Sequence, residues 1–389
     1  MSMNTNIKTG DTCEFITKEI EAASLLRKQK RTDSWFVSRY GMNLYRGCTH
    51  NCAYCDGRAD TYNVEGDFGK KVEVKVNAPE LLKKELDPAR KRKPMQRGFI
   101  MTGGGVGDSY QPVEQQYGIT RKILEIIHEH GFPVHILTKS ILVEKDMDIL
   151  KTINNKTRTI VSFSLSSADD EISAVFEPCA SPPSERLSAI ARLKKQGLYC
   201  GVYYMPVIPF VTDTPVQIAR TLDKIREAGA DFVLFAGMTM KTGRQRDYYY
   251  DLLRNYNPDL ITRYDQIYSE NKWGQASPGY YKHLNDLYRM VSARYKIPRR
   301  IPASLFHDMV EENDLVAVIL EQLDYLVKSR GQKSPYGYAA YSVSQLKEPG
   351  SSLKNNLQQL KGVGKFTEKI ILEILEKGSA GYYEGMLRG

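Results

Sequence analysis

The chain has 389 residues, of which 41% are hydrophobic, and its formal net charge is +9. Six cysteines are too few for a disulfide-bonded scaffold, residues 1–10 lack the apolar core of a signal peptide, and no apolar run reaches membrane-spanning length. These features predict a cytoplasmic protein without a membrane partner, built from one large domain and an accessory piece. The excess of cations favours polyanionic partners such as nucleic acids.

The order of apolar and polar residues predicts an α/β fold. Residues 1–39 are expected to form an N-terminal extension, and residues 40–330 a domain with a helical layer. Short β-branched runs alternate with amphipathic stretches up to residue 240, as in a parallel sheet wound by helices. The strands are predicted at residues 42–45, 98–102, 134–137, 159–165, 200–206 and 231–235. Helices are predicted at residues 112–130, 144–154, 183–196 and 215–228, several beginning at proline.

Cys48, Cys52 and Cys55 follow the first predicted strand with a three-then-two spacing. Three thiolates leave one iron of a four-iron cluster without a protein ligand, because ordinary clusters of this type take four cysteines. That iron is open to the amino and carboxylate groups of S-adenosylmethionine (SAM), which joins iron–sulfur centres in radical chemistry. A zinc site would need a fourth ligand, and His50 is too close to two of the cysteines; a disulfide is the other alternative.

The CxxxCxxC spacing with an aromatic residue, Tyr54, before the third cysteine resembles the signature of the radical SAM superfamily. The resemblance implies a partial (β/α)6 TIM-type barrel with its active residues at the carboxyl ends of the strands. It also implies a [4Fe–4S] cluster, SAM, a 5′-deoxyadenosyl radical and an electron donor such as flavodoxin or ferredoxin.

A glycine-rich stretch, residues 102–114, follows the second predicted strand. By the resemblance, this turn holds the methionine part of SAM, and glycines let the backbone approach a ligand. Asp108 or Glu114 replaces the glutamate that usually follows. A turn without a ligand is the alternative. The candidate SAM-binding residues here are Gly103, Gly104, Gly105 and Asp108.

Polar residues also follow the fourth predicted strand. The hydroxyls of Ser164 and Ser166 are placed to bind SAM, and Glu177 belongs to the same candidate set. Arg186 is expected to bind the SAM carboxylate through two hydrogen bonds. The alternative is an ion pair of Arg186 with Glu177 or Glu185.

Three motifs resemble the branch that contains spore photoproduct lyase and the DNA repair photolyase-like proteins. They are Asp-x-Tyr-Gln-Pro-x-Glu at 108–114, Glu-Pro at 177–178 before Ser-Glu-Arg-Leu at 184–187, and Met-Pro-Val-Ile-Pro at 205–209. In that branch the radical opens a thymine photodimer, and a cysteine returns a hydrogen atom. Cys179 is the candidate for this catalytic thiol, although a buried structural cysteine is an alternative. Tyr110, Tyr204 or solvent are other hydrogen sources.

The C-terminal part is expected to consist of a linker at residues 331–352 and a helix-hairpin-helix with a tail at residues 353–389. Gly362 and Gly364 allow a tight turn, and Lys365 and Lys369 stand beside the amide-rich start of the second helix, which suits a phosphate. A helical pair that only packs on the barrel is the alternative. Tyrosines and cations at 241–300 either stack bases or cap the barrel, and the basic run at 90–97 is a solvated loop or a phosphate contact.

The leading hypothesis is a radical SAM enzyme that acts on nucleic acid, with DNA favoured and a spore photoproduct lyase-like repair reaction as the specific case. The alternatives are a radical enzyme that modifies RNA or a protein, and an iron–sulfur DNA-binding protein without catalysis. The intact cysteine triplet and the glycine turn argue against the last of these.

Overall fold

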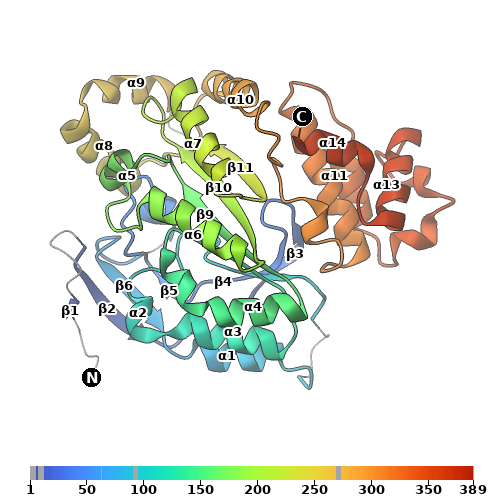
Figure 1. Ribbon diagram of the computed structural model, residues 1–389, viewed down its shortest axis with the longest axis horizontal. Helices are drawn as coiled ribbons and strands as arrows, with labels where there is room; N and C mark the ends of the chain where they lie inside the picture. Colours follow the sequence, from blue (N-terminus) through green and yellow to red (C-terminus); the bar gives the residue numbers. More distant parts are fainter. Residues whose placement is uncertain (1–5, 8–12, 63, 91–94, 269–272, 389) are drawn as a thin grey trace.

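The computed structural model describes residues 6–7, 13–62, 64–90, 95–268 and 273–388, with a curled sheet at its centre and a helical unit beside it (Figure 1). The sheet has seven strands in the order β11-β10-β9-β8-β7-β4-β3. All neighbours pair in parallel except β3, which pairs antiparallel with β4. Five of the six expected strands are found close to their predicted bounds. The first, expected at 42–45, lies earlier as β4, while Tyr45 belongs to the other sheet, and β3 is an additional edge strand. The bounds are β3 Arg27–Asp33, β4 Ser38–Met42, β7 Phe99–Thr102, β8 Val134–Thr138, β9 Thr159–Leu165, β10 Tyr199–Val207 and β11 Phe232–Gly237.

Helices cover the outer face of this sheet, as the alternating pattern predicts (Figure 1). Their apolar stripes pack into one buried cluster with the outward side chains of the strands, which include Ile100, Val161 and Val202. The single helix expected at 112–130 is divided, because Gly118 adopts a left-handed conformation with φ 59°. The helices are α2 Glu114–Tyr117, α3 Ile119–Glu129, α4 Met147–Lys156, α5 Asp170–Phe176, α6 Pro183–Lys195 and α7 Pro215–Glu227.

A second, four-stranded sheet lies beside the start of the barrel, in the order β1-β2-β6-β5. The segment 1–39 is therefore more than an extension, since it supplies strands to both sheets. β5 ends two residues before Cys48 and pairs antiparallel with β6, so this sheet fixes where the cysteine loop begins. The elements are β1 Asn6–Ile7, β2 Phe15–Ile20, β5 Tyr45–Arg46, β6 Lys71–Lys75 and the following helix α1 Ala78–Leu86.

The remaining helices form two groups. Three of them, α8 Arg244–Tyr256, α9 Asp259–Ile267 and α10 Pro278–Ser292, lie at the top of the view, with α8 beside α5 and α10 beside α7 (Figure 1). The C-terminal unit comprises α11 Glu312–Lys328, α12 Tyr336–Ser344, α13 Lys365–Lys377 and α14 Gly381–Arg388. None of the helices that the structure describes is long and apolar enough to cross a lipid bilayer.

The C-terminal unit shares its core with the inside of the barrel. Phe99 and Leu234 from the strands lie in one buried cluster with Ile370 and Leu387 from the unit. The hydroxyl of Tyr383 donates to Gln322 Oε1 at 2.6 Å, which ties α14 to α11. Residues 331–352 differ from the expected linker because they contain α12. The expected helix-hairpin-helix lacks a regular first helix: only the short 3-10 turns Gly350–Leu353 and Leu357–Gln359 precede α13.

Candidate active site

A cavity of about 300 Å³ lies at the carboxyl ends of the parallel strands. Its lining includes the apolar side chains of Phe36, Leu137 and Met205. The turn after β7 forms one wall, and a side chain at Gly103 would meet the carbonyl oxygen of Leu137 at 2.1 Å, so this wall requires glycine. The cavity brings together many of the candidate residues: Cys48, Cys52, Cys55, Tyr54, Gly103, Gly105, Asp108 and Ser164. Gly104, Ser166, Glu177 and Arg186 are not among its lining residues.

A buried arginine holds the cysteine loop in place. Arg58 is 3% exposed, and its guanidinium donates to the carbonyl oxygens of Cys52, Phe68 and Asn51 at 3.0, 3.1 and 3.1 Å. The guanidinium also lies 3.4 Å from the ring centroid of Tyr248 and 5.1 Å from that of Phe68. The guanidinium of Arg58 thus donates its hydrogen bonds to the backbone around the cysteines. No spacing rule in the sequence marks this role.

The three thiols suit an iron–sulfur cluster better than a single ion. Burial raises the pKa of Cys52 to about 12 and also raises the pKa values of Cys48 and Cys55, so the thiolates need a metal to stabilise them. Across the described ranges, no three His, Cys, Asp or Glu side chains converge on one metal-ion position. A zinc ion requires its ligands to converge on one position, whereas each cysteine of a cluster binds a separate iron.

Asp108 joins three segments around the cavity. Its carboxylate accepts hydrogen bonds from the Thr138 hydroxyl at 2.9 Å and from the amides of Lys139 and Tyr110, both at 2.8 Å. His50 Nε2 lies 3.0 Å from the same carboxylate. Burial raises the pKa of Asp108, but His50 and the amides outweigh burial and hold it below its usual value. Asp108 therefore orients the glycine turn and the cysteine loop, with its oxygens already occupied by protein donors.

Glu114, the alternative to Asp108, lies outside the cavity. It is fully buried and accepts from the Tyr45 hydroxyl and from the amide of Thr120, the latter at 2.9 Å. Glu114 therefore stabilises the start of α3 through Thr120 and the start of the cysteine loop through Tyr45, from outside the cavity.

The structure corrects the expectation for Arg186. Its side chain is fully buried and pairs with the equally buried Glu177, and Nη1 donates to the carbonyl oxygen of Ser164 at 2.6 Å. The ion pair considered as the alternative is the one observed. Burial raises the pKa of Glu177, but Arg186 and Lys139 outweigh it and hold that pKa well below its usual value.

The cation that faces the cavity is Lys139, which no motif identified. Its ammonium donates to Ser164 Oγ at 2.9 Å and to Glu177 Oε1 at 3.0 Å. It also lies 5.5 Å from the ring centroid of Tyr54, whose hydroxyl donates to Glu177. Lys139 directly follows β8, so the topology places its positive charge at the mouth of the barrel beside the cysteines.

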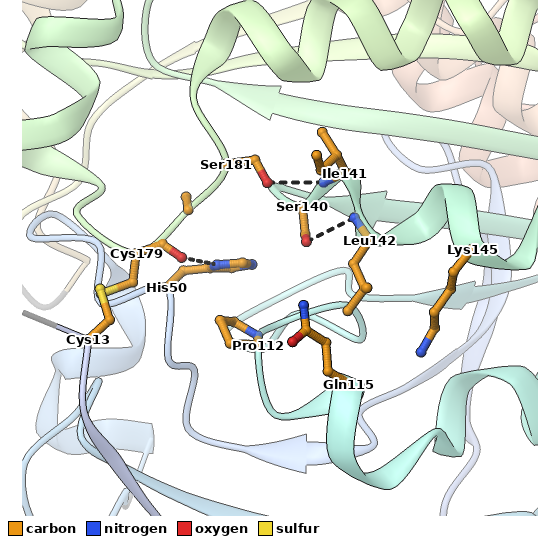
Figure 2. Close-up of a pocket in the computed structure, with 11 residues that line it drawn as sticks. Cys13, His50, Pro112, Gln115, Ser140, Ile141, Leu142, Lys145, Cys179 and Ser181 are labelled. Carbon is orange, nitrogen blue, oxygen red and sulfur yellow. Dashed lines mark hydrogen bonds between the residues drawn. A yellow bond between two sulfur atoms is a disulfide. The ribbon is translucent and has the colours of Figure 1, made fainter. Parts of the chain in front are cut away.

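The structure also corrects the expectation of a free thiol at Cys179. Cys179 forms a disulfide with Cys13, and both line a neighbouring cavity of about 550 Å³ (Figure 2). His50 lies between the two cavities: its Nδ1 is 3.1 Å from the carbonyl oxygen of Cys179, and its own carbonyl accepts from the Cys179 amide at 3.3 Å. The sulfur of Cys179 is therefore bonded, and it does not line the cavity of the three cysteines.

The other candidate hydrogen donors are placed elsewhere. Tyr110 is fully buried and bonds Asp146 at 3.0 Å, and Tyr204 is buried on the helical side of the sheet. Neither lines the cavity of the cysteines.

The candidate nucleic-acid residues lie in the C-terminal unit, away from the cavity. Gly362 packs its hairpin against Tyr338 and Ala339 of α12, while Gly364 precedes α13, on which Lys365 and Lys369 are exposed. The tyrosine-rich layer at 241–300 has a packing role at its centre, because the buried hydroxyls of Tyr249 and Tyr264 are 2.8 Å apart. Its cations Lys241 and Arg244 pair with Asp56 and Asp60 of the cysteine loop. Of the basic run at 90–97, residues 91–94 lie outside the described residues.

The half-barrel, the cysteine triplet with Cys48 and Cys52 buried, and the glycine turn define an iron–sulfur enzyme that uses SAM. The chain belongs to the radical SAM superfamily: the family model described as "Radical SAM superfamily" matches residues 42–222. The expected superfamily is thereby confirmed, and membership implies a [4Fe–4S] cluster and SAM.

The chain is also similar in sequence to two relatives and in fold to one solved structure. An uncharacterised protein of Mycobacterium tuberculosis is 30% identical over 263 residues, which cover 67% of this chain and 75% of the relative. The radical SAM Nalpha-GlyT isomerase of Pseudomonas phage M6 is 22% identical over 246 residues. The match covers 62% of this chain and 48% of the phage protein. The structure of spore photoproduct lyase complexed with dinucleoside spore photoproduct is similar in fold, with a TM-score of 0.55 and 18% sequence identity. The match covers 72% of this chain and 79% of the lyase chain.

Proposed function

We propose that this enzyme acts on nucleic acid, with a spore photoproduct lyase-like repair of DNA as the favoured reaction. One observation carries the proposal: the three cysteines share their cavity with the apolar side chains of Phe36, Leu137 and Met205. A planar nucleobase suits these side chains, because its flat aromatic faces can be buried against them. The similarity in fold to spore photoproduct lyase, which binds a dinucleoside photoproduct, supports the same class of substrate.

The side chains divide the work of the site. Cys48, Cys52 and Cys55 hold the cluster, and the cluster and SAM, when bound, supply the 5′-deoxyadenosyl radical. Tyr54, Gly103, Gly105 and Ser164, which line the cavity, would border SAM, and Lys139 would neutralise its carboxylate. Phe36 and Met205 exclude water from the reacting face.

Charge supports a polyanionic substrate. The net charge of +9 and the exposed Lys365 and Lys369 of the C-terminal unit favour phosphate, and DNA is favoured over RNA or a protein. An electron donor such as flavodoxin or ferredoxin completes the system. A rearrangement is the second candidate reaction, because the phage relative is named an isomerase.

The test is anaerobic incubation of the reconstituted enzyme with SAM, a reductant and one of three substrates: irradiated DNA, undamaged DNA or RNA. We expect irradiated DNA to accelerate 5′-deoxyadenosine release and to yield a repaired product in mass spectrometry. The control is the variant in which Cys48, Cys52 and Cys55 are all alanine, which should release none. Equal, slow release with all three nucleic acids and without any of them would contradict the proposal.

A further inference from the structure

Helix α12 carries two solvent-exposed aromatic side chains, Tyr338 and Tyr341, which are called the α12 stripe below. Tyr338 and Tyr341 are 64% and 59% exposed. They are three residues apart, so they lie on the same face of the helix, and Ser344 continues that face. The ammonium of Lys361 lies 5.4 Å from the ring centroid of Tyr338. The stripe therefore offers adjacent ring faces with a cation beside them.

The stripe leads directly to a basic edge strand. Arg31 Nη1 of β3 donates to Ser344 Oγ at 3.4 Å and its Nη2 pairs with Glu321 of α11 at 2.6 Å, so Arg31 joins the strand to α12 and α11. β3 carries Arg27, Lys28, Lys30 and Arg31 within five positions, and Arg27 and Lys30 are exposed. It forms the edge of the seven-stranded sheet beside α11 (Figure 1).

The edge strand runs toward the active site. Arg27 pairs with Gly41, next to the carboxyl end of β4, from which the chain enters the cysteine loop. Arg27 and Lys30 thus lie on the strand that leads from the C-terminal unit to the rim of the barrel.

We propose that this surface, made of Tyr338, Tyr341, Lys361, Lys30 and Arg27, binds a single-stranded stretch of nucleic acid and guides it to the cavity. The inference rests on the proposed function and specifies its substrate as single-stranded at this surface. Exposed tyrosine rings stack on bases that are not already stacked in a duplex, and the cations near them attract the phosphates.

A protective role of the edge strand does not explain the whole surface. Lysines on an edge strand commonly prevent pairing with another sheet. Exposed tyrosines beside them would work against that protection, because adjoining exposed aromatic rings promote association. An acidic peptide that pairs with the edge of β3 is the competing occupant, and it would use the cations without the rings of α12.

The test measures the affinity of the cluster-loaded full chain for a fluorescent single-stranded oligonucleotide that covers a site of about 4–16 nucleotides. We expect Tyr338→Ala and Tyr341→Ala each to raise Kd about fivefold or more, the scale of one lost base–aromatic stack. Arg27→Gln and Lys30→Gln should each reduce the slope of log K against log salt by about 0.7. The matched controls are Met290→Ala, at a side chain 68% exposed on α10, and Lys195→Gln on α6; both should bind as the wild type does.

Several outcomes would overturn the inference. Unchanged affinity in the tyrosine variants, with binding by the wild type, removes this surface but leaves the proposed function intact. Tighter binding of the matching duplex than of the single strand would show that the surface binds duplex instead. Displacement of the oligonucleotide by a polyglutamate peptide, to the same extent in the wild type and in Tyr341→Ala, would show that the surface binds an acidic peptide instead. If the wild type binds no nucleic acid at all, the inference and the proposed function fail together. Circular dichroism and cluster absorbance of each variant show whether it is folded.

Discussion

Arg186 and Glu177 form an ion pair in which both side chains are fully buried. The pair lies behind the wall of the active-site cavity, and Lys139 joins it from the cavity side through its bond to Glu177 at 3.0 Å. Two cations therefore meet one carboxylate, but only Lys139 lines the cavity. A buried pair of this kind orients its neighbours, and removal of one partner leaves an uncompensated charge.

The first prediction separates the two cations. Lys139→Gln should weaken SAM binding about tenfold or more, because a hydrogen bond to a charged group contributes about 1.5–3 kcal/mol. Equilibrium dialysis of the cluster-loaded enzyme with SAM measures this change. Arg186→Met should instead destabilise the fold by about 3–5 kcal/mol, which a fall in Tm reveals. An Arg186→Met protein with normal stability and weak SAM binding would contradict this prediction and show that Arg186 binds the carboxylate of SAM.

The second prediction concerns the cysteine loop. Arg58→Lys keeps the charge but cannot reach the three carbonyl oxygens that the planar guanidinium binds, so the loop should lose its cluster several-fold faster under a chelator. The decay of cluster absorbance under anaerobic conditions gives the rate. Arg244→Lys is the control, because Arg244 binds Asp60 of the same loop with a side chain 43% exposed. Equal rates for Arg58→Lys and the wild type would leave Arg58 a packing residue.

The third prediction addresses the disulfide between Cys13 and Cys179. Cys13→Ser and Cys179→Ser should lower the stability of the oxidised protein equally, by about 2–5 kcal/mol, because either change removes the same cross-link. Thermal unfolding with and without reductant measures this, and reductant should bring the wild type to the level of the variants. Both variants should keep the product yield. A yield that falls in Cys179→Ser but not in Cys13→Ser would restore the thiol of Cys179 as a hydrogen donor.

The fourth prediction is a pH dependence of stability. Burial lowers the pKa of His135 to about 4, against the hydrogen bond to the Phe36 carbonyl, which raises it. The unfolded chain, with an imidazole pKa of about 6.5, binds a proton below that pH while the folded protein does not. Stability should therefore fall as the pH drops from about 6.5 toward 4, by about 2 kcal/mol at pH 5 from this residue. Urea unfolding of the wild type and His135→Gln at about pH 7 and pH 5 measures it; an identical pH dependence in both would contradict the prediction.

Local patterns were enough to predict the central sheet and the cysteine triplet. The strand bounds at 159–165 agree with β9 to the residue, because a run that begins with three β-branched residues and continues with Phe and Leu indicates a buried parallel strand. The triplet was equally visible, since its chemistry depends on spacing along one loop. The expected SAM ligands at Gly103 and Ser164 reached the cavity because both directly follow or end a strand.

What the sequence did not reveal depends on contacts between distant segments. Lys139 is one lysine among many until β8 brings it beside Tyr54 and Glu177. The partner of Cys179 is 166 residues away, so no spacing rule links the two cysteines. The polar run of β3 lacks the apolar alternation of a strand, because it is an edge strand whose side chains are largely exposed.

The shared core of the barrel and the C-terminal unit has a consequence for how the protein is made. Phe99 and Leu234 point into the inner side of the sheet, where Ile370 and Leu387 later cover them. A ribosome adds about 5–20 residues per second, so these strands wait for many seconds with an apolar inner surface exposed. The half-barrel should therefore depend on a chaperone during synthesis, and a ribosome stalled before α13 would display a surface prone to aggregation.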